Sequence, residues 1–345
     1  MTTPFRADRL QHINCFSEMC MGEAHDARLF NTNLRLAKQW GSKLLKLLTF
    51  SDFRCKNNNK LVPLTVKKLL FKTKMSLLGK KTLCVITGAS RGIGKAITLK
   101  LVSHLGPKSH VILIARDQKA LESVKVEALS KATDVSVSVL PLDLSNVSKE
   151  LYHTALNGAI EKTCTVRFDL ALLIQNAATV GPVDLRALQL RNVDLVRDYF
   201  DLNVTSFIIF NNVFFALCDE HFAKERMAVN ISSGASYASL PSLHLYSAGK
   251  AARDAFYRCF AAEETGIRVL NFNPGPVTTD MQMEIYEKTH STEIKEWSKD
   301  GMDNSTFATC EAVAEKFVDC LERNDFESGA FRTVDNHTLV FRFED

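Results

Sequence analysis

The sequence lacks the patterns that mark several large classes of protein. Its nine cysteines are odd in number and scattered, and no two of them have the Cys-x-x-Cys spacing. This argues against a disulfide framework or a zinc site and indicates a reducing compartment, for which we expect the cytoplasm. No uninterrupted apolar run reaches the roughly 18 residues that a membrane span needs. We therefore expect no span, and we find no internal repeat or low-complexity tract.

Positive charge is concentrated in the N-terminal segment. Residues 1–74 hold 14 Lys+Arg against 5 Asp+Glu, whereas the remaining residues hold 29 against 34. Because this larger part has a small negative net charge, it offers no electrostatic basis for binding nucleic acid. The chain is 46% hydrophobic and 24% charged, which is typical of a soluble globular protein.

Residues 1–74 show no alternation of strand and helix patterns. Lysines among the leucines of residues 34–50 can form a basic amphipathic helix, which would suit a membrane surface or a targeting signal. Four acidic residues argue against a mitochondrial signal: Asp8, Glu18, Glu23 and Asp26. We expect a poorly ordered extension over 1–74, dispensable for catalysis, and a catalytic domain over 75–345.

A glycine-rich turn follows the first strand pattern of that domain. Residues 82–86 are apolar and β-rich, and residues 95–105 have a helical pattern. Glycines between a strand and a helix let the backbone approach a pyrophosphate, which the helix N-terminus favours. The sequence therefore predicts a dinucleotide site at Gly88, Ala89, Ser90, Arg91, Gly92, Ile93 and Gly94.

The second strand, residues 110–115, ends in Arg116 and not in an acidic residue. An acidic side chain there would hold the ribose 2′-hydroxyl of NAD, whereas arginines pair with the 2′-phosphate of NADP. Arg91 and Arg116 together therefore favour NADP(H). Asp117, one position later, keeps an NAD alternative open.

Two further strands end in residues suited to the same nucleotide. Residues 135–140 lead to Asp143 and Leu144, from which a side chain and backbone can reach an adenine. Residues 168–174 are followed by Asn176 and two alanines, whose small side chains let the backbone pass close beneath a ribose and nicotinamide.

Tyr246 and Lys250 lie four residues apart in a helix expected over 245–264, so they share one face. A nearby ammonium lowers the pKa of a phenol, which makes the pair a candidate proton donor or acceptor. Ser233 ends the fifth strand, 13 residues before Tyr246, and its loop can return the hydroxyl to the phenol. Asn203 lies within a long helix expected over 193–219, where a buried amide needs hydrogen-bond partners.

The rest of the domain continues the alternation. A strand over 268–273 precedes the loop Pro274–Thr279. Residues 280–306 have a variable pattern that we interpret as a mobile flap. A helix over 310–323 then precedes a last strand ending at Asp335. The predicted fold is α/β, a Rossmann-like doubly wound parallel sheet in a single domain. Its site should lie at the carboxyl ends of the strands.

Together these motifs resemble the short-chain dehydrogenase/reductase family over residues 80–335. The resemblance implies a catalytic tetrad of Asn203, Ser233, Tyr246 and Lys250. Tyr246 would donate the proton, Ser233 would hold the substrate oxygen, Lys250 would bind the ribose and lower the tyrosine pKa, and Asn203 would position a water. The loop residues Val277, Thr278 and Thr279 would contact the nicotinamide.

Within that family the sequence is similar to the sepiapterin reductases, on the stretches Ala251-Ala252-Arg253-Asp254, Thr279-Asp280-Met281-Gln282 and Phe326-Glu327-Ser328-Gly329-Ala330. This implies NADPH-dependent reduction of a pterin side-chain carbonyl in the last steps to tetrahydrobiopterin. The implied substrate residues are Ser233, Gly234, Tyr246, Gly275, Met281, Gln282 and, as a carboxylate anchor, Asp335. An ungapped alignment puts Thr333 at the anchor position instead.

Two other functions remain open on the same residues. One is a carbonyl reductase of broad specificity, and the other is a non-catalytic NADP-binding sensor. The resemblance also implies a homodimer formed through the helices expected over 193–219 and 245–264.

Overall fold

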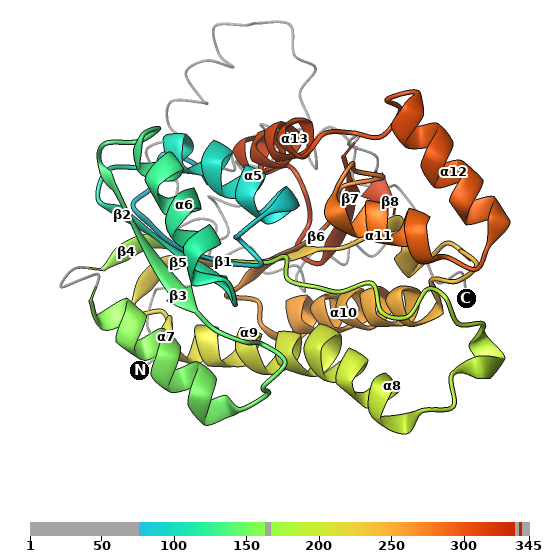
Figure 1. Cartoon of the computed structure of the whole chain (residues 1–345). Helices are drawn as coiled ribbons and strands as arrows, with labels where there is room; N and C mark the ends of the chain where they lie inside the picture. Colours follow the sequence, from blue (N-terminus) through green and yellow to red (C-terminus); the bar gives the residue numbers. More distant parts are fainter. Residues whose placement is uncertain (1–75, 163–166, 335–337, 340–345) are drawn as a thin grey trace, which may run out of the picture. The chain divides into compact units, whose positions relative to one another are not determined.

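The computed structural model describes residues 76–162, 167–334 and 338–339 of the chain. Within them, eight strands form one sheet in the order β3-β2-β1-β4-β5-β6-β7-β8 (Figure 1). The strands are β1 Thr82–Thr87, β2 Ser109–Ala115, β3 Val135–Pro141, β4 Phe168–Gln175, β5 Ala223–Ile231, β6 Arg268–Asn273, β7 Ala330–Thr333 and β8 Thr338–Leu339. The predicted extension 1–74 and Asp335 lie outside the described residues.

Seven of these strands are parallel, and only β8 pairs antiparallel, with β7. Strands β1 and β4 are mostly apolar and almost entirely buried, as expected for a parallel sheet covered on both faces. The strand order reverses between β1 and β4. In doubly wound folds ligands bind at such a reversal, beyond the carboxyl ends of the strands. The predicted fold class is therefore confirmed.

Helices cover both faces of the sheet (Figure 1). Helices α5, α6 and α13 lie on one face, and α7, α9 and α10 lie on the other. The helices are α5 Gly92–Leu101, α6 Gln118–Leu129, α7 Lys149–Glu161, α8 Val193–Phe200, α9 Ser206–Leu217, α10 His244–Glu263, α11 Asp280–Lys288, α12 Thr292–Asp303 and α13 Cys310–Arg323. Short turns are η2 Val102–His104, η3 Ala187–Gln189, the π-helical η4 Asp201–Thr205 and η5 Gly234–Ser236.

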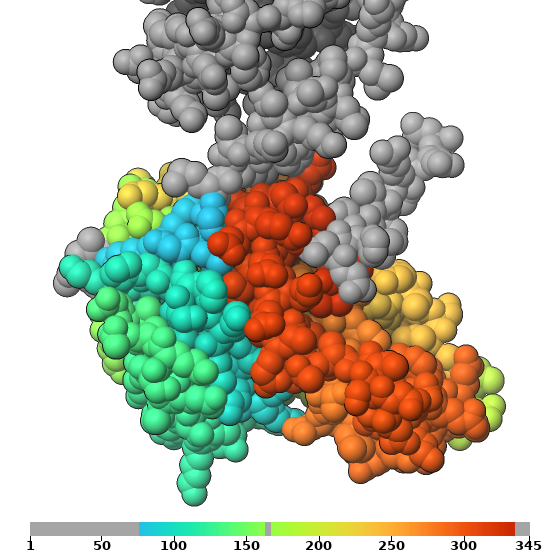
Figure 2. All heavy atoms as spheres, turned by 90° about the horizontal axis from the view of Figure 1, so that it is seen from above, coloured from blue at the N-terminus to red at the C-terminus, as the bar shows by residue number. Residues whose placement is uncertain are grey.

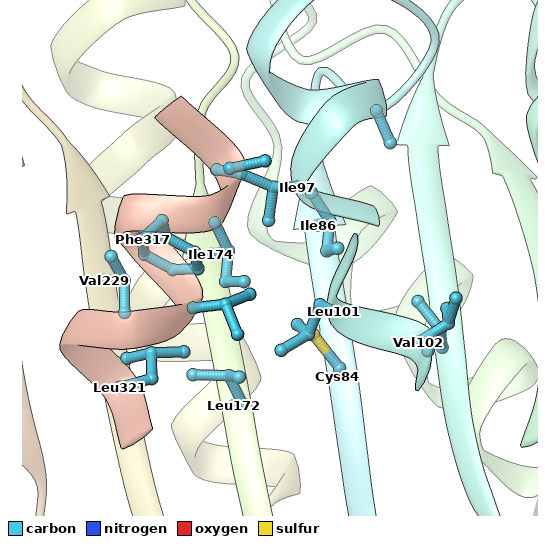
Figure 3. Close-up of a cluster of buried hydrophobic side chains, with 14 of the residues drawn as sticks. Cys84, Ile86, Ile97, Leu101, Val102, Leu172, Ile174, Val229, Phe317 and Leu321 are labelled. Atoms are coloured by element: carbon cyan, nitrogen blue, oxygen red, sulfur yellow. The ribbon is translucent and has the colours of Figure 1, made fainter. Parts of the chain in front are cut away.

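The core under α5 and α13 joins the two ends of the described chain. Figure 2 shows the early, blue part of the sequence directly against the late, red part. Beneath them, aliphatic side chains of α5 and β1 meet those of α13 and β4 (Figure 3). Phe317 is fully buried there and meets Phe272 edge to face, with ring centroids 5.2 Å apart.

The core on the other face is aromatic. Phe207, Phe210 and Phe214 of α9 are buried against the sheet with Tyr152 and Tyr257. Among the described residues, the continuous helical stretch Val193–Leu217 is long and apolar enough to pass a test for a membrane span, with a mean hydropathy of 1.4. Core helices of globular domains pass the same test, and α9 is packed as one, so this stretch is weak evidence for a span.

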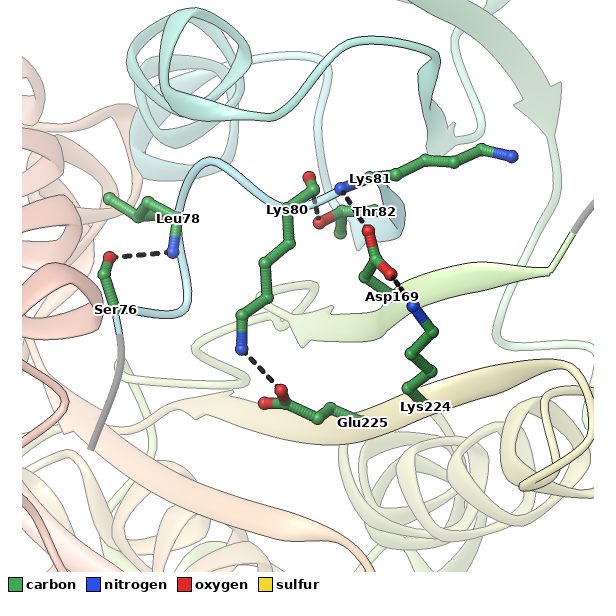
Figure 4. A network of polar contacts seen from close by, with 8 residues as sticks. All are labelled: Ser76, Leu78, Lys80, Lys81, Thr82, Asp169, Lys224 and Glu225. Atoms are coloured by element: carbon green, nitrogen blue, oxygen red, sulfur yellow. Dashed lines mark hydrogen bonds and ion pairs between the residues drawn. The ribbon is translucent and has the colours of Figure 1, made fainter. Parts of the chain in front are cut away.

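The amino ends of the strands, opposite the candidate site, carry a polar network (Figure 4). The ammonium of Lys80 pairs with Glu225 at 2.6 Å, and that of Lys224 pairs with Asp169 at 2.7 Å. The backbone N–H of Lys81 also donates to Asp169. These contacts tie the starts of β1, β4 and β5 together at the surface, where each pair contributes little stability.

Residues 280–306 differ from the sequence-based expectation of a variable flap. They form two regular helices, α11 and α12, whose N-termini are capped by the hydroxyls of Thr279 and Ser291. Each helix buries only a few side chains, such as Ile285 and Ile294. The segment is therefore helical, and its mobility as a flap stays a prediction.

Replacing Phe317 with alanine should lower the free energy of unfolding by about 3–5 kcal/mol, since it empties a fully buried site. Urea denaturation measures the change. Glu225→Gln, which removes a surface ion pair, is the control and should cost less than about 1 kcal/mol. Equal effects of the two changes would contradict the assignment of the core.

Candidate active site

The glycine turn after β1 has a backbone conformation and a packing that favour glycine. Gly88 and Gly92 have φ angles of +66° and +55°, a conformation that favours glycine. A Cβ on Gly94 would lie 2.2 Å from the carbonyl oxygen of Gly88 and 2.6 Å from Nδ2 of Asn176. The turn is therefore packed directly against the end of β4.

The N-terminus of α5 suits an anionic ligand. Its N-cap, Arg91, makes no side-chain cap, and no acidic residue lies in the first turn. By contrast, six other described helices are capped by a side chain, namely that of Asp117, Ser148, Asn192, Thr279, Ser291 or Thr309. A pyrophosphate fits this end, because it would accept from the free N–H groups that the other helices satisfy internally.

Asn176 joins the glycine turn to the end of β4. Its amide donates to the carbonyl oxygens of Thr87 and Gly88 at 3.2 and 3.0 Å. The hydroxyl of Thr87 in turn accepts from the backbone N–H groups of Asn176 and Ala177. The side chain of Asn176 thus holds the turn in place, so a bound dinucleotide would meet its backbone and not its amide.

The residues expected at the adenosine end differ in whether their side chains already have partners within the protein. Arg91 forms an exposed ion pair with Asp280 at 2.5 Å. Arg116 is exposed and close enough to Asp143 to lower the pKa of that carboxyl, although hydrogen bonds from Ser145 lower it more. Asp117 accepts from the N–H of Ala120 and caps α6, so the carboxylate that kept NAD open already has a structural role.

Leu144 and the loop after β6 complete the nucleotide side. Leu144 is buried and its carbonyl oxygen accepts from Tyr152 at 2.7 Å. Val277 pairs with Ala308, and the Thr279 methyl would lie 3.9 Å from a Cβ on Gly92. The loop 274–279 therefore runs beside the glycine turn.

Asn203 lies in the π-helical turn η4, between α8 and α9, with only 2% of its surface exposed. Its amide oxygen accepts from the N–H of Thr179 at 3.0 Å, and its amide nitrogen donates to the carbonyl oxygen of Tyr199 at 2.9 Å. Its polar atoms are thus satisfied, as a buried amide requires. A π turn commonly marks a functional position within a helix.

Ser233 and Tyr246 meet across the loop that follows β5. Ser233 has an extended backbone, and its oxygen also accepts from the N–H of Ala235 at 3.2 Å. A hydrogen bond between Ser233 and Tyr246 lowers the pKa of the phenol. Thus the serine and tyrosine hydroxyls lie together at the carboxyl end of the sheet.

Lys250 is buried one helical turn beyond Tyr246. Its ammonium donates to the carbonyl oxygen of Ile231 at 2.7 Å and lies 5.5 Å from the centroid of the Tyr246 ring. Burial and the nearby Arg253 lower the pKa of Lys250 to about 7, while Asp254 opposes the shift. Lys250 therefore gains or loses its proton near neutral pH.

The pKa of Tyr246 is raised, whereas the sequence predicted that it would be lowered. Burial raises it, and the groups that oppose this rise are Ser233 first and Arg253 second. We expected Lys250 to lower the pKa of the tyrosine. The Lys250 ammonium lies 5.5 Å from the centroid of the Tyr246 ring, and its effect on the phenol stays a prediction.

The sequence analysis assigned no role to two residues at this site. Arg253, one turn beyond Lys250, is 2% exposed and contacts the backbone of Asn203. Tyr199 lies between two glycines: a Cβ on Gly181 would come within 2.8 Å of its ring, and a Cβ on Gly249 within 2.8 Å of its hydroxyl oxygen. An arginine on the face that Tyr246 and Lys250 share was the available signal for the first, and Gly249 in midhelix for the second.

Some of the residues expected around the substrate lie beside Tyr246. Met281 and Tyr246 pack against one apolar cluster, made by Val180, Val183, Leu243, Ile285 and Ile294. Gly234 and Gly275 lie in the turns after β5 and β6. Gln282 is buried, and its amide donates to the hydroxyl of Ser298 at 2.8 Å. Gln282 therefore joins α11 to α12, which leaves its side chain committed to the fold.

Lys250→Met should change how stability depends on pH. In the wild type the folded protein loses the Lys250 proton near pH 7, whereas the unfolded chain keeps it to about pH 10. The unfolded state then binds more protons, so the wild-type free energy of unfolding rises with pH in this window. The methionine variant lacks this rise, and its stability relative to wild type should fall by about 2 kcal/mol between pH 7 and 9.

Urea denaturation at several pH values measures this difference. The exposed Lys119, changed to methionine, is the control and should show no such trend. A stability difference that stays constant from pH 7 to 9 would refute a depressed lysine pKa.

Comparison with known proteins identifies the family. Residues 82–290 match the family model of short chain dehydrogenases. The chain is 32% identical over 254 residues to sepiapterin reductase of Bos taurus, covering 72% of this chain and 93% of that protein. It is 31% identical over 212 residues to benzil reductase ((S)-benzoin forming) of Bacillus subtilis (strain 168), covering 59% and 77%.

Among solved structures, a short chain dehydrogenase of Shigella flexneri 2a str. 301 complexed with NADP has a similar fold. The TM-score is 0.61 at 20% identity, over 76% of this chain and 100% of that one. The sequence matches establish the family and this structure supports the fold. The chain therefore belongs to the short-chain dehydrogenase/reductase family of NAD(P)(H)-dependent oxidoreductases, close to the sepiapterin reductases.

Proposed function

We propose that this protein reduces a carbonyl group on the side chain of a pterin with NADPH, as the sepiapterin reductases do. The observation that carries the proposal is the contact between Ser233 and Tyr246 with Lys250 buried behind them. The identity of 32% over nearly the full length of a sepiapterin reductase narrows the substrate class. On this proposal the enzyme acts in the last steps to tetrahydrobiopterin.

The residues of the nucleotide side would hold NADPH. The glycine turn and the N-terminus of α5 would bind the pyrophosphate, and Arg91 and Arg116 the 2′-phosphate. Asp143 and Leu144 would contact the adenine, and Val277, Thr278 and Thr279 the nicotinamide. When bound, NADPH supplies the hydride that adds to the carbonyl carbon.

Protein residues supply the proton. Ser233 would donate a hydrogen bond to the substrate oxygen and orient it, and Tyr246 would give its phenolic proton as that oxygen becomes an alcohol. The resulting phenolate is stabilised by the positive groups behind it and recovers a proton through Lys250, whose pKa of about 7 suits that exchange. Asn203 would hold the water on this route.

The substrate would lie over the apolar cluster beside Tyr246. A flat pterin ring can pack on Met281 and its apolar neighbours while its side-chain carbonyl reaches Ser233. Gly234 and Gly275 would leave room for the ring. For the guanidine-like edge of the pterin we propose Asp335 as the carboxylate, because carboxylates accept paired N–H bonds well.

A reductase of broad specificity is the second candidate. The relative named for forming (S)-benzoin from benzil, 31% identical over 212 residues, favours it. Rates with sepiapterin and with benzil, each measured under the same conditions, separate the two. Stoichiometric NADPH binding without oxidation by any ketone would instead favour a non-catalytic sensor.

We further propose a cytoplasmic homodimer. The described cysteines, Cys84, Cys218, Cys259, Cys310 and Cys320, are free thiols, which suits a reducing compartment. Helices α8 to α10 would form the contact between subunits. Residues 1–74 are proposed to be dispensable for turnover, so a chain starting at Met75 should oxidise NADPH with sepiapterin at the rate of the full chain.

Tyr246→Phe should lower turnover of sepiapterin at least 100-fold, because the phenolic proton is lost. NADPH binding should change less than threefold, since the phenol lies outside the proposed nucleotide contacts. Turnover is followed by NADPH absorbance and binding by NADPH fluorescence. A variant that kept the wild-type rate would refute the role of Tyr246 as proton donor.

Arg116→Ala should raise the KM for NADPH about tenfold or more and leave that for NADH nearly unchanged, because only NADPH has the 2′-phosphate. Arg116 is the better test of the two arginines, since Arg91 is already paired with Asp280. Lys316→Ala, on the exposed side of α13, is the control. An equal effect on both cofactors would contradict the proposed preference.

A further inference from the structure

Asn273, the last residue of β6, has a buried amide whose nitrogen makes no hydrogen bond to any residue that the structure describes. Asn273 is 5% exposed. Its Oδ1 accepts from the backbone N–H of Gly275 at 3.0 Å, and its backbone carbonyl oxygen accepts from the N–H of Val334 at 2.9 Å. Neither contact uses Nδ2. Because a buried amide without a partner is costly, this nitrogen is suited to a group that enters from outside the protein.

The amide nitrogen faces the residue that follows Ser233. A Cβ on Gly234 would lie 3.7 Å from Nδ2 of Asn273 and 3.6 Å from the hydroxyl oxygen of Tyr237. These are ordinary contact distances, so there is room above Gly234 for one methyl-sized group. An oxygen atom in that place would be within about 1 Å of hydrogen-bonding distance of both polar groups. The polar ends of two side chains therefore converge on a space beside Ser233.

Packing against the sheet holds both side chains in place. The ring of Tyr237 meets the buried ring of Phe331 edge to face, with centroids 5.6 Å apart, an arrangement that aromatic pairs favour. Tyr237 follows directly on the turn η5, which begins at Gly234. Asn273 is fixed by its own bond to the N–H of Gly275. The two polar groups thus come from β6 and η5, at the same carboxyl end of the sheet as Ser233.

We propose that Asn273 and Tyr237 determine substrate specificity by binding a second oxygen of the substrate. The assignment rests on the proposed function, in which Ser233 and Tyr246 hold the carbonyl that is reduced. Nδ2 of Asn273 donates to the second oxygen, and the hydroxyl of Tyr237 donates to it if it is a carbonyl or accepts from it if it is a hydroxyl. Because Gly234 directly follows Ser233, this oxygen is carried on the carbon next to the reacting carbonyl.

A substrate without the second oxygen would leave Nδ2 of Asn273 buried and unpaired, which is how a polar site discriminates against an analogue that lacks its partner. Two pairs of compounds differ in that oxygen alone. Deoxysepiapterin lacks the hydroxyl that sepiapterin carries next to its side-chain carbonyl, and deoxybenzoin lacks the second carbonyl oxygen of benzil. The ratio of kcat/KM between the members of a pair isolates the contribution of this oxygen.

The experiment measures this ratio for the full chain and its variants, with NADPH oxidation as the signal. Asn273→Asp keeps an oxygen for the N–H of Gly275 and loses the donor, so the ratio should fall about fivefold or more. Asn273→Leu is an uncharged second variant of similar size. Tyr237→Phe keeps the ring that meets Phe331 and loses the hydroxyl, and its ratio should fall about threefold or more.

Tyr286→Phe removes a tyrosine hydroxyl from α11, outside this space, and is the control that should keep the wild-type ratio. Folding of each variant is verified by cooperative urea denaturation. Equal losses on both members of a pair would mean that Asn273 only supports the turn at Gly275, and this overturns the proposal. It also falls if Tyr237→Phe keeps the wild-type ratio, or if neither Asn273 variant folds.

The same measurements separate this proposal from the function on which it rests. Turnover of both members of a pair with an unchanged ratio in the variants would refute the roles of Asn273 and Tyr237 alone. Turnover of benzil but not of sepiapterin, with the expected fall in the ratio, would refute the pterin substrate and support the two residues. Absence of turnover with all four compounds would refute carbonyl reduction, and the specificity roles with it.

Discussion

One face of helix α10 determines the spacing of the whole site. Tyr246, Lys250 and Arg253 follow one another along it at intervals of four and three residues, and each contacts a different neighbouring segment. Tyr246 meets Ser233 after β5, Lys250 meets the carbonyl oxygen of Ile231 at the end of β5, and Arg253 meets Asn203 and Ala177. A shift of this helix by one residue would break all three contacts together, since a helical turn carries each side chain by about 100° per residue.

Burial makes these contacts chemically useful. Lys250 and Arg253 are buried, and burial lowers the pKa of both because water no longer stabilises their charged forms. For Lys250 this brings the pKa to about 7, within reach of proton exchange at neutral pH. The same burial raises the pKa of Tyr246, which keeps the proton on the phenol at neutral pH. The site therefore combines Tyr246, a phenol of raised pKa, with Lys250, whose pKa lies near neutral pH.

The nucleotide and substrate sides are joined through backbone contacts. The glycine turn packs on Asn176, and the next residue, Ala177, accepts from Arg253. On the other side, Tyr246 packs against the apolar cluster that α11 and α12 help to form. Tyr246 thus lies between the rigid end of the sheet and two helices that come from a separate part of the chain. On the proposed function, specificity for the substrate can change through these helices without altering the strand ends.

The sequence alone determined the fold class, most strand positions and the order of the motifs, because apolar strand patterns, the glycine turn and the four-residue spacing of Tyr246 and Lys250 are local signals. Only the tertiary structure decided which polar groups are satisfied within the protein. Gln282 bonds to Ser298 and Asp117 caps α6, and Arg253 proved to be a buried cation. Nor could local patterns give the direction of the Tyr246 pKa shift. Burial and hydrogen-bond partners depend on residues far apart in the chain, and these come together only when the sheet and its helices pack.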